Sequence, residues 1–77
     1  MSRIRYRKFR AAMDAAGLGK VELWKDRDYF WIYSDDPELA DKISSLNETG
    51  IYTSRFSDYT VDEWINIIRE LVKPLGL

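Results

Sequence analysis

The chain has 77 residues, no cysteine, no histidine and a formal net charge of −1. A chain of this length predicts a single domain, residues 1–77, with one modest core. The two missing residue types exclude disulfides, thiolate or imidazole metal sites and every histidine-based catalytic triad. Paired carboxylates fall at expected helix starts, where capping explains them. We therefore expect no catalytic residues, no metal, no cofactor and no enzymatic activity.

Charge is distributed unevenly along the chain. The first ten residues carry five basic side chains and no acid, whereas the other 67 carry seven bases against 13 acids. A basic head can contact nucleic acid, and an acidic body can mimic it or simply be solvated. The sequence has no apolar run near the roughly 20 residues that cross a bilayer, and its start lacks the apolar segment of a signal peptide. We expect a cytoplasmic protein.

The N-terminal segment predicts a helix from Ser2 to Ala16. Tyr6, Phe9 and Met13 recur at helical spacing, and Gly17 suits the position after a helix end. Basic residues near a helix N-terminus oppose the helix dipole, which hints that the charge has a use. The residues that would contact nucleic acid are Arg3, Arg5, Arg7, Lys8 and Arg10.

The stretch from Lys20 to Ser34 predicts a β-hairpin. A two-residue turn at Asp26 and Arg27 would place Trp24 opposite Tyr29, although neither this pair nor Arg27 with Asp28 has the glycine that tight turns favour. This register separates an aliphatic face from an aromatic one, whereas a three-residue turn would mix them. The first face comprises Val21, Leu23, Phe30 and Ile32; the second comprises Glu22, Trp24, Tyr29, Trp31 and Tyr33.

Two further helices and one strand follow. Asp36 is a helix cap and Pro37 suits the first helical position, which predicts a short helix to about residue 46. Residues 51–56 alternate as a third strand. Thr60 and Glu63 have the spacing of a capping box, so a last helix is expected over residues 61–73.

These elements predict an α+β fold of order α-β-β-α-β-α. A three-stranded antiparallel sheet would carry the N- and C-terminal helices on one face. The aromatic side of the hairpin would then face solvent, unless the short acidic helix folds over it. Three interpretations stay open: the aromatic residues fill the core, they form a homodimer contact, or they bind another macromolecule.

Two stretches carry a resemblance to a known group of proteins. The runs WKDRDYFWIYSDD at residues 24–36 and TGIYTSRFSDYTVDEWINIIREL at residues 49–71 resemble small proteins of unknown function encoded by bacteriophages, plasmids and integrated elements. The resemblance implies a mobile-element origin and action in the host cytoplasm. Small acidic proteins from such elements are often inhibitors of host machinery, anti-CRISPR proteins among them.

The sequence thus predicts a non-enzymatic protein-interaction module of phage or mobile-element type. It would block a host defence complex sterically or by mimicking nucleic acid. The expected partner-binding residues are Trp24, Tyr29, Trp31, Tyr33, Asp35, Asp36, Glu38 and Asp41, with Asp58, Asp62 and Glu63 adding acidic surface. The alternative is a DNA- or RNA-binding accessory that acts through the basic N-terminal helix.

Overall fold

A computed structural model describes residues 2–77 and has an antiparallel sheet with helices on one of its faces. The strands are β1 (Ser2–Arg3), β2 (Glu22–Asp26), β3 (Tyr29–Tyr33) and β4 (Gly50–Tyr52), and they lie side by side in that order. The helices are α1 (Arg7–Ala15), α2 (Pro37–Ser44) and α3 (Val61–Val72), with short 3-10 turns η1 (Phe56–Asp58) and η2 (Lys73–Leu75). The α+β class is confirmed.

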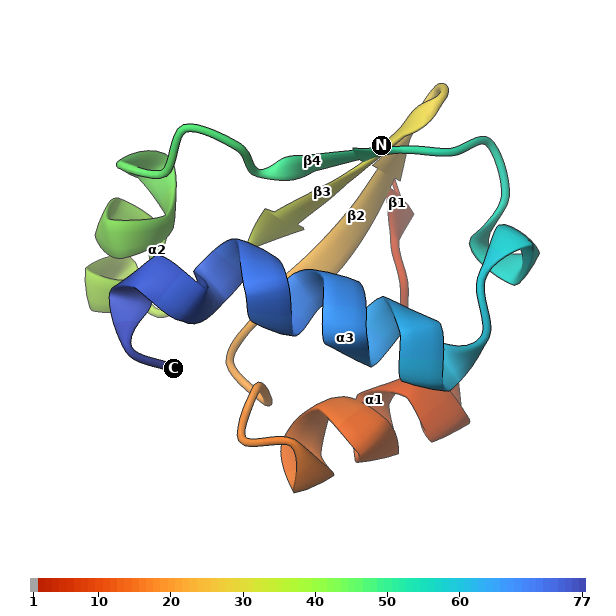
Figure 1. The fold of residues 1–77 in the computed structure, drawn as a ribbon, viewed down its shortest axis with the longest axis horizontal. Coiled ribbons are helices and arrows are strands. Elements are labelled where there is room, and N and C mark those ends of the chain that lie inside the picture. Colours follow the sequence, from red (N-terminus) through yellow and green to blue (C-terminus); the bar gives the residue numbers. More distant parts are fainter. Residues whose placement is uncertain (1) are drawn as a thin grey trace.

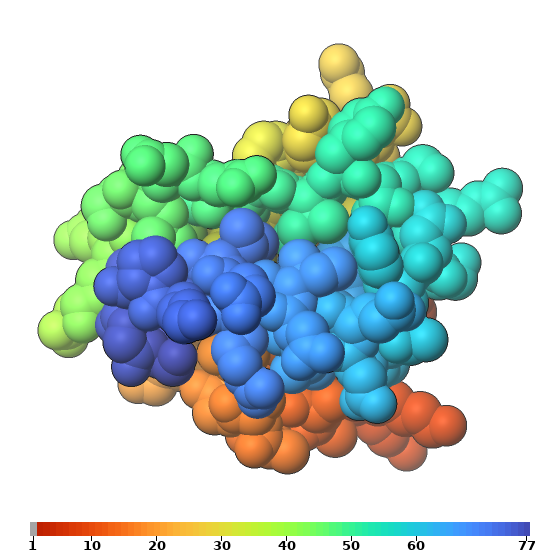
Figure 2. Space-filling model, in the orientation of Figure 1, coloured from red at the N-terminus to blue at the C-terminus, as the bar shows by residue number. Residues whose placement is uncertain are grey.

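Helices α1 and α3 lie on the same side of the sheet, and α2 sits at one end (Figure 1). From this side, the surface of the molecule is formed mainly by α3 in blue, α1 in orange and the region around α2 in green (Figure 2). The core lies between this helical layer and the sheet. Its largest fully buried side chains include Trp64, Phe9, Phe30, Met13 and Leu23.

The prediction of three strands was wrong because the chain begins with a strand, not with a helix. Ile4 lies off the apolar stripe of the expected helix, so a helix from Ser2 would have exposed it. The short strand instead turns Ile4 into the core, and its amide donates to the carbonyl of Leu23 at 2.8 Å. Helix α1 therefore begins only at Arg7, and the order of elements becomes β-α-β-β-α-β-α.

The predicted register of the hairpin was also wrong, because the turn lies one residue further along the chain than expected. The turn is formed by Arg27 and Asp28, so Trp24 lies opposite Trp31. Arg27 adopts a φ of +57°, the left-handed conformation that a tight hairpin turn requires. This register brings the Ser34 hydroxyl to the carbonyl of Lys20, to which it donates at 2.7 Å.

The two faces of the hairpin nevertheless have the predicted composition. Moving a two-residue turn by one residue shifts every cross-strand partner by two positions, and two positions is the side-chain period of a strand. Val21, Leu23 and Phe30 are accordingly buried on the inner face. An error of two positions in the register therefore does not change which residues lie on which face of the hairpin.

The strand expected over residues 51–56 ends at Tyr52. The chain leaves the sheet there because Phe56 packs against the core: its ring stacks on Trp64 at 5.2 Å, with 5° between the ring planes. The indole nitrogen of Trp64 donates to the carbonyl of Phe56 at 2.7 Å. This pair fixes the connection between β4 and α3.

Both predicted helix caps are confirmed. The Asp36 carboxylate accepts from the amide of Glu38 at 3.1 Å and begins α2, which ends at Ser44, two residues earlier than expected. At the start of α3 the Thr60 hydroxyl accepts from the amide of Glu63 at 3.2 Å, and the Glu63 carboxylate accepts from the amide of Thr60 at 2.9 Å. These two reciprocal hydrogen bonds provide acceptors for two backbone amides that have no partner within the helix.

Replacing the cap residue should therefore weaken the fold. Thr60→Ala removes the acceptor for the Glu63 amide, and we expect the free energy of unfolding to fall by about 1 kcal/mol. Urea denaturation followed by circular dichroism measures the change. Ser57→Ala, at an exposed hydroxyl in η1, is the matched control and should stay within about 0.5 kcal/mol of the parent protein. Equal stability of both variants would contradict the assigned role of the capping box.

Candidate functional site

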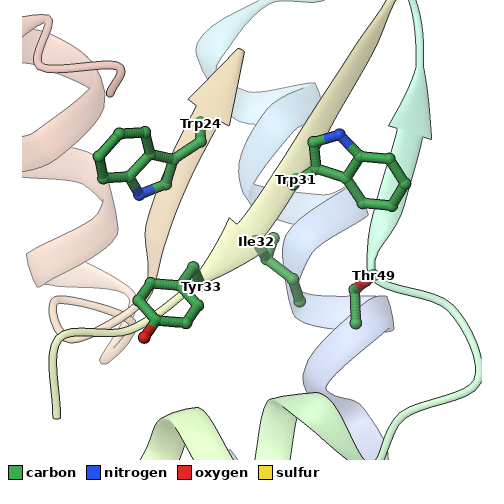
Figure 3. Close-up of a pocket in the computed structure, with 5 residues that line it drawn as sticks. All are labelled: Trp24, Trp31, Ile32, Tyr33 and Thr49. Carbon is green, nitrogen blue, oxygen red and sulfur yellow. The ribbon is translucent and has the colours of Figure 1, made fainter. Parts of the chain in front are cut away.

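The candidate site is the side of the sheet that faces away from α1 and α3. Side chains alternate between the two sides of each strand, so paired residues share a side. Trp24 pairs with Trp31, Tyr29 with Tyr52, and Glu22 with Tyr33. We call this side the aromatic face, and its rings are those of Trp24, Tyr29, Trp31, Tyr33 and Tyr52. In Figure 3, which views it, α3 passes behind β2 and β3.

Trp31 is held at the centre of the aromatic face by its neighbours on β3 and β4. Its ring stacks on Tyr29 with centroids 5.1 Å apart and 19° between the planes, and Tyr29 meets Tyr52 edge to face at 5.1 Å. The indole also lies over Gly50, where an added Cβ atom would come within 2.6 Å of the ring. The glycine is thus required by the close approach of the ring.

Trp24 is held at the other side of the face by Arg3 from β1. The guanidinium of Arg3 lies 4.8 Å from the centre of the Trp24 ring. The same guanidinium is 3.2 Å from the carboxylate of Asp35, and its Nε atom is 4.0 Å from that of Glu22. Arg3 therefore fixes the indole by a cation–π contact and is itself fixed by two acids.

A hollow of about 360 Å³ lies between the two tryptophans. The indoles turn to opposite sides, Trp24 away from β3 and Trp31 toward β4, and Tyr33 closes one end (Figure 3). Ile32 and Thr49 complete the lining. Tyr29 packs against Trp31 and Arg3 against Trp24, and neither residue lines the hollow, so both indoles are held in place without a ligand.

The predicted acidic residues have divided roles. Asp35 is paired with Arg3, and Asp36 accepts from the ammonium of Lys20 at 3.3 Å as well as capping α2. The hydrogen bond from Lys20, aided by the amide of Glu38, lowers the pKa of Asp36 below its ordinary value of 3.8. Four of the predicted acids lie in residues 35–41. Two of these, the exposed Glu38 and Asp41, form no ion pair within residues 2–77.

The other three predicted acids lie outside the aromatic face, in η1 and the first turn of α3. Asp58 accepts from the Thr53 hydroxyl and from the amide of Arg55 at 3.2 Å, and these bonds lower its pKa below 3.8, with the Thr53 contact as the main cause. Glu63 belongs to the capping box, and Asp62 is exposed beside it. These acids thus mainly stabilise turns and helix starts.

The five basic residues of the N-terminus do not form one surface. Arg3 lies on the sheet, and Arg10 donates to the carbonyls of Val21 at 2.9 Å and Gly19 at 2.8 Å. Arg10 also lies 3.6 Å from the carboxylate of Glu22. Three exposed residues remain available for an external ligand: Arg5, Arg7 and Lys8. Of these, Arg5 precedes α1, so the expected basic helix is shorter than the sequence suggested.

The structure thus brings four of the predicted partner-binding residues together, namely Trp24, Tyr29, Trp31 and Tyr33. Asp35 joins them through Arg3, while Glu38 and Asp41 lie apart on α2. Three members of the face were missed: Arg3, Gly50 and Tyr52. Tyr52 alternates with the buried Ile51, so the pattern would have placed it here had the position of β4 in the sheet been known.

Residues 2–77 offer neither a cluster of metal ligands nor a membrane-spanning helix. Within that range no group of three or more Asp and Glu side chains is arranged to hold a metal ion. No helix in the same range is both long enough and apolar enough to cross a bilayer. Comparison with known protein families, curated proteins and solved structures gives no match to the chain.

The contact of Trp31 with Gly50 can be tested by a double-mutant cycle. Gly50→Ala should lower the free energy of unfolding by about 1–3 kcal/mol, because the new Cβ atom displaces a ring that Tyr29 restrains. Urea denaturation gives the stabilities. In a Trp31→Val background the obstacle is gone, so the same substitution should be neutral or stabilising. An equal cost in both backgrounds would show that the ring is not the cause.

The lowered pKa of Asp58 predicts a pH-dependent stability. A carboxyl whose pKa is lower in the folded than in the unfolded state contributes stability above its unfolded pKa, near 3.9, and loses it as the pH falls further. Asp58→Asn should therefore be less stable than the parent at pH 7, and the difference should shrink as the pH falls below about 4. Urea denaturation over a pH series measures it.

The control removes the donor to Asp58. Thr53→Val deletes the main cause of the lowered pKa, so the loss of stability below about pH 4 should be smaller than in the parent. A pH profile of Thr53→Val that matches the parent would contradict the role of this hydrogen bond.

Proposed function

We propose that the chain is a non-enzymatic protein-interaction module that docks through its aromatic face. The observation that carries the proposal is the position of five aromatic rings on a sheet face over which no helix of residues 2–77 lies (Figure 1). Tyr52 is 71% exposed, Tyr33 49% and Tyr29 40%. Tryptophan and tyrosine are enriched among the residues that dominate binding energy in protein interfaces.

The charges around the aromatic face favour a basic partner. Four carboxylates lie on it or at its margins, those of Glu22, Asp26, Asp28 and Asp35. Three guanidiniums lie beside them, those of Arg3, Arg10 and Arg27, which leaves an excess of one negative charge. Complementary charge speeds association and selects among partners. The proposed partner is therefore a protein whose surface carries basic residues and groups that pack against aromatic rings.

Steric blocking is better supported than mimicry of nucleic acid. A phosphate mimic needs free carboxylates in a row, but Asp35, Asp36 and Asp58 are each bound to groups of this chain. The extension of the proposal to an inhibitor of a host defence complex, acting in the host cytoplasm, is supported by the resemblance of residues 24–36 and 49–71 to small mobile-element proteins. The aromatic face would then cover a functional surface of that complex.

A nucleic-acid-binding role has less support from the contacts. Arg3 and Arg10 would have to leave carboxylates and backbone carbonyls to reach phosphate. The remaining cluster of Arg5, Arg7 and Lys8 is small, and the excess of acid on the aromatic face repels a nucleic-acid backbone. Tight binding in an electrophoretic shift assay that weakens steeply with salt would favour this role over the proposed one.

The proposal predicts which substitutions abolish docking. Trp24→Ser combined with Trp31→Ser should weaken binding of a partner, first isolated by affinity capture and then purified, by at least about 30-fold, because a central interface aromatic contributes about 2 kcal/mol or more. Calorimetric titration measures the affinity, and circular dichroism confirms that the variant is folded.

The matched control is Tyr6→Ser, which removes an aromatic ring that is 58% exposed but outside the aromatic face. This variant should bind the partner as the parent does. Equal affinity of the double variant and the parent would contradict the proposal. So would sedimentation that shows a stable homodimer lost in the double variant, since the face would then be occupied by a second copy.

A further inference from the structure

A second hollow lies where the C-terminal ends of α2 and α3 meet, and we call it the helix-end groove. Its volume is about 420 Å³, and it is lined by residues 45–48, which follow α2, and by Glu70, Leu71, Pro74 and Leu75. In Figure 2 it lies where the green segment after α2 adjoins the blue end of the chain. The next residue, Thr49, lines the hollow on the aromatic face, so one loop borders both hollows.

The floor of the helix-end groove is apolar and is held by the core. Leu46, Leu71 and Leu75 line the groove, and all three are half-buried and pack against the buried core. The lining residues, all within residues 2–77, include no aromatic side chain. A guest would therefore place aliphatic groups on this floor and would find no ring on which to stack.

Two carboxylates line the groove, one from each of its two segments. Glu48 follows α2, Glu70 lies in the last turn of α3, and both are exposed. Neither carboxylate forms an ion pair with a cation of residues 2–77, in contrast to the paired acids beside the aromatic face. Arg69 and Lys73 are close to Glu70 in sequence, but they lie outside the lining and do not pair with it.

The helix ends add to the negative charge of the groove. Helix α2 ends at Ser44 and α3 ends at Val72, and the groove is lined by residues at both ends. The C-terminal end of a helix carries about half an elementary negative charge. The side chains that line the groove have a formal charge of −2, with no cation among them. Negative charge above an aliphatic floor selects a cation on an aliphatic stem.

We infer that the helix-end groove binds a lysine side chain of the protein partner. The methylene groups lie on the leucines, and the ammonium lies between the carboxylates of Glu48 and Glu70. Lysine carries a compact charge on a flexible four-carbon stem, whereas arginine gains from stacking on rings that this groove does not have. The inference goes beyond docking through the aromatic face, and it rests on the proposed function for the protein nature of the partner.

Short peptides test the assignment. The probes are acetyl-Gly-Lys-Gly-amide and the same peptide with Nε-acetyl-lysine, which keeps the aliphatic stem but removes the charge. Carbon–proton correlation spectra at low ionic strength follow the methyl signals of Leu46, Leu71 and Leu75 during each titration. The methyl signals of Leu23 are the internal reference, because this side chain is fully buried. The lysine peptide should shift the three groove signals saturably and leave those of Leu23 unchanged.

Charge should decide the affinity of the peptides. The acetyl-lysine peptide should bind about fivefold more weakly or worse, because it loses two exposed ion pairs that each contribute up to about fivefold. Salt at about 0.3 M should weaken the lysine peptide, because it screens exposed charges. Equal affinity for the acetylated peptide, or binding that is insensitive to salt, would overturn the assignment. An arginine peptide that binds more tightly than the lysine peptide would overturn the choice of lysine.

Variants separate the groove from the overall charge of the protein. Glu48→Gln and Glu70→Gln should each weaken the lysine peptide about two- to fivefold, and the double variant should weaken it about tenfold. Asp41→Asn is the matched control, because it removes one exposed, unpaired carboxylate of α2 that lies outside the lining. This variant should bind as the parent does. Equal weakening in Asp41→Asn would overturn the assignment, since net charge would then be the cause.

Binding of the purified partner distinguishes this inference from the proposed function. Glu48→Gln combined with Glu70→Gln should weaken the partner about fivefold or more. If the partner binds this variant as it binds the parent, the lysine assignment is wrong, while loss of binding in the tryptophan double variant still supports docking through the aromatic face. If the glutamine variant loses the partner and the tryptophan variant retains it, the groove assignment holds and the proposed function fails.

Discussion

The fold depends on one constraint: the helices of residues 2–77 cover a single side of the sheet. Trp64 of α3 and Phe9 of α1 fill the space over the inner face, and Phe56 is drawn out of the strand region to stack on Trp64. Four strands packed in this way have a second face in water. That face is built from aromatic residues, which pack against one another and still tolerate contact with solvent. The candidate site is a direct result of this asymmetry.

A second set of interactions connects the N-terminus to the aromatic face. Glu22 on β2 lies between Arg10 of α1, at 3.6 Å, and Arg3 of β1, at 4.0 Å. Arg10 also donates to two carbonyls near the start of β2, which joins α1 to the sheet. Two of the basic N-terminal residues, Arg3 and Arg10, are therefore paired with acids of the same chain. Their charges stabilise the fold and are not free to bind a ligand.

Much of this could be predicted from the sequence, and the failures have physical reasons. The caps at Asp36 and Thr60 depend on contacts within four residues, so local sequence determines them. The sidedness of the hairpin was predicted although its register was not, because period-two alternation is insensitive to a turn moved by one residue. The left-handed conformation of Arg27 has no sequence signal, since glycine usually occupies such a position.

The strand β1 and the end of β4 could not be predicted for a different reason. A strand of two residues has no periodicity, and its pairing with Trp24 depends on contacts across more than 20 residues. The departure of the chain after Tyr52 depends on the distant Trp64, which binds Phe56. The sequence accordingly predicted the residues of the candidate site that lie on the hairpin. It did not predict the contributions of Arg3 from β1 and of Gly50 and Tyr52 from β4.

The edges of the sheet help to decide how a partner would bind. An exposed edge strand can pair with another chain through its backbone, and such pairing is largely independent of sequence. Here β1 has two residues and β4 has three, so either edge offers few free backbone groups. Docking of the proposed kind would then rely on the side chains of the aromatic face. In the proposed function, the side chains of Trp24, Trp31 and their neighbours on the aromatic face would supply the specificity, because backbone pairing cannot supply it.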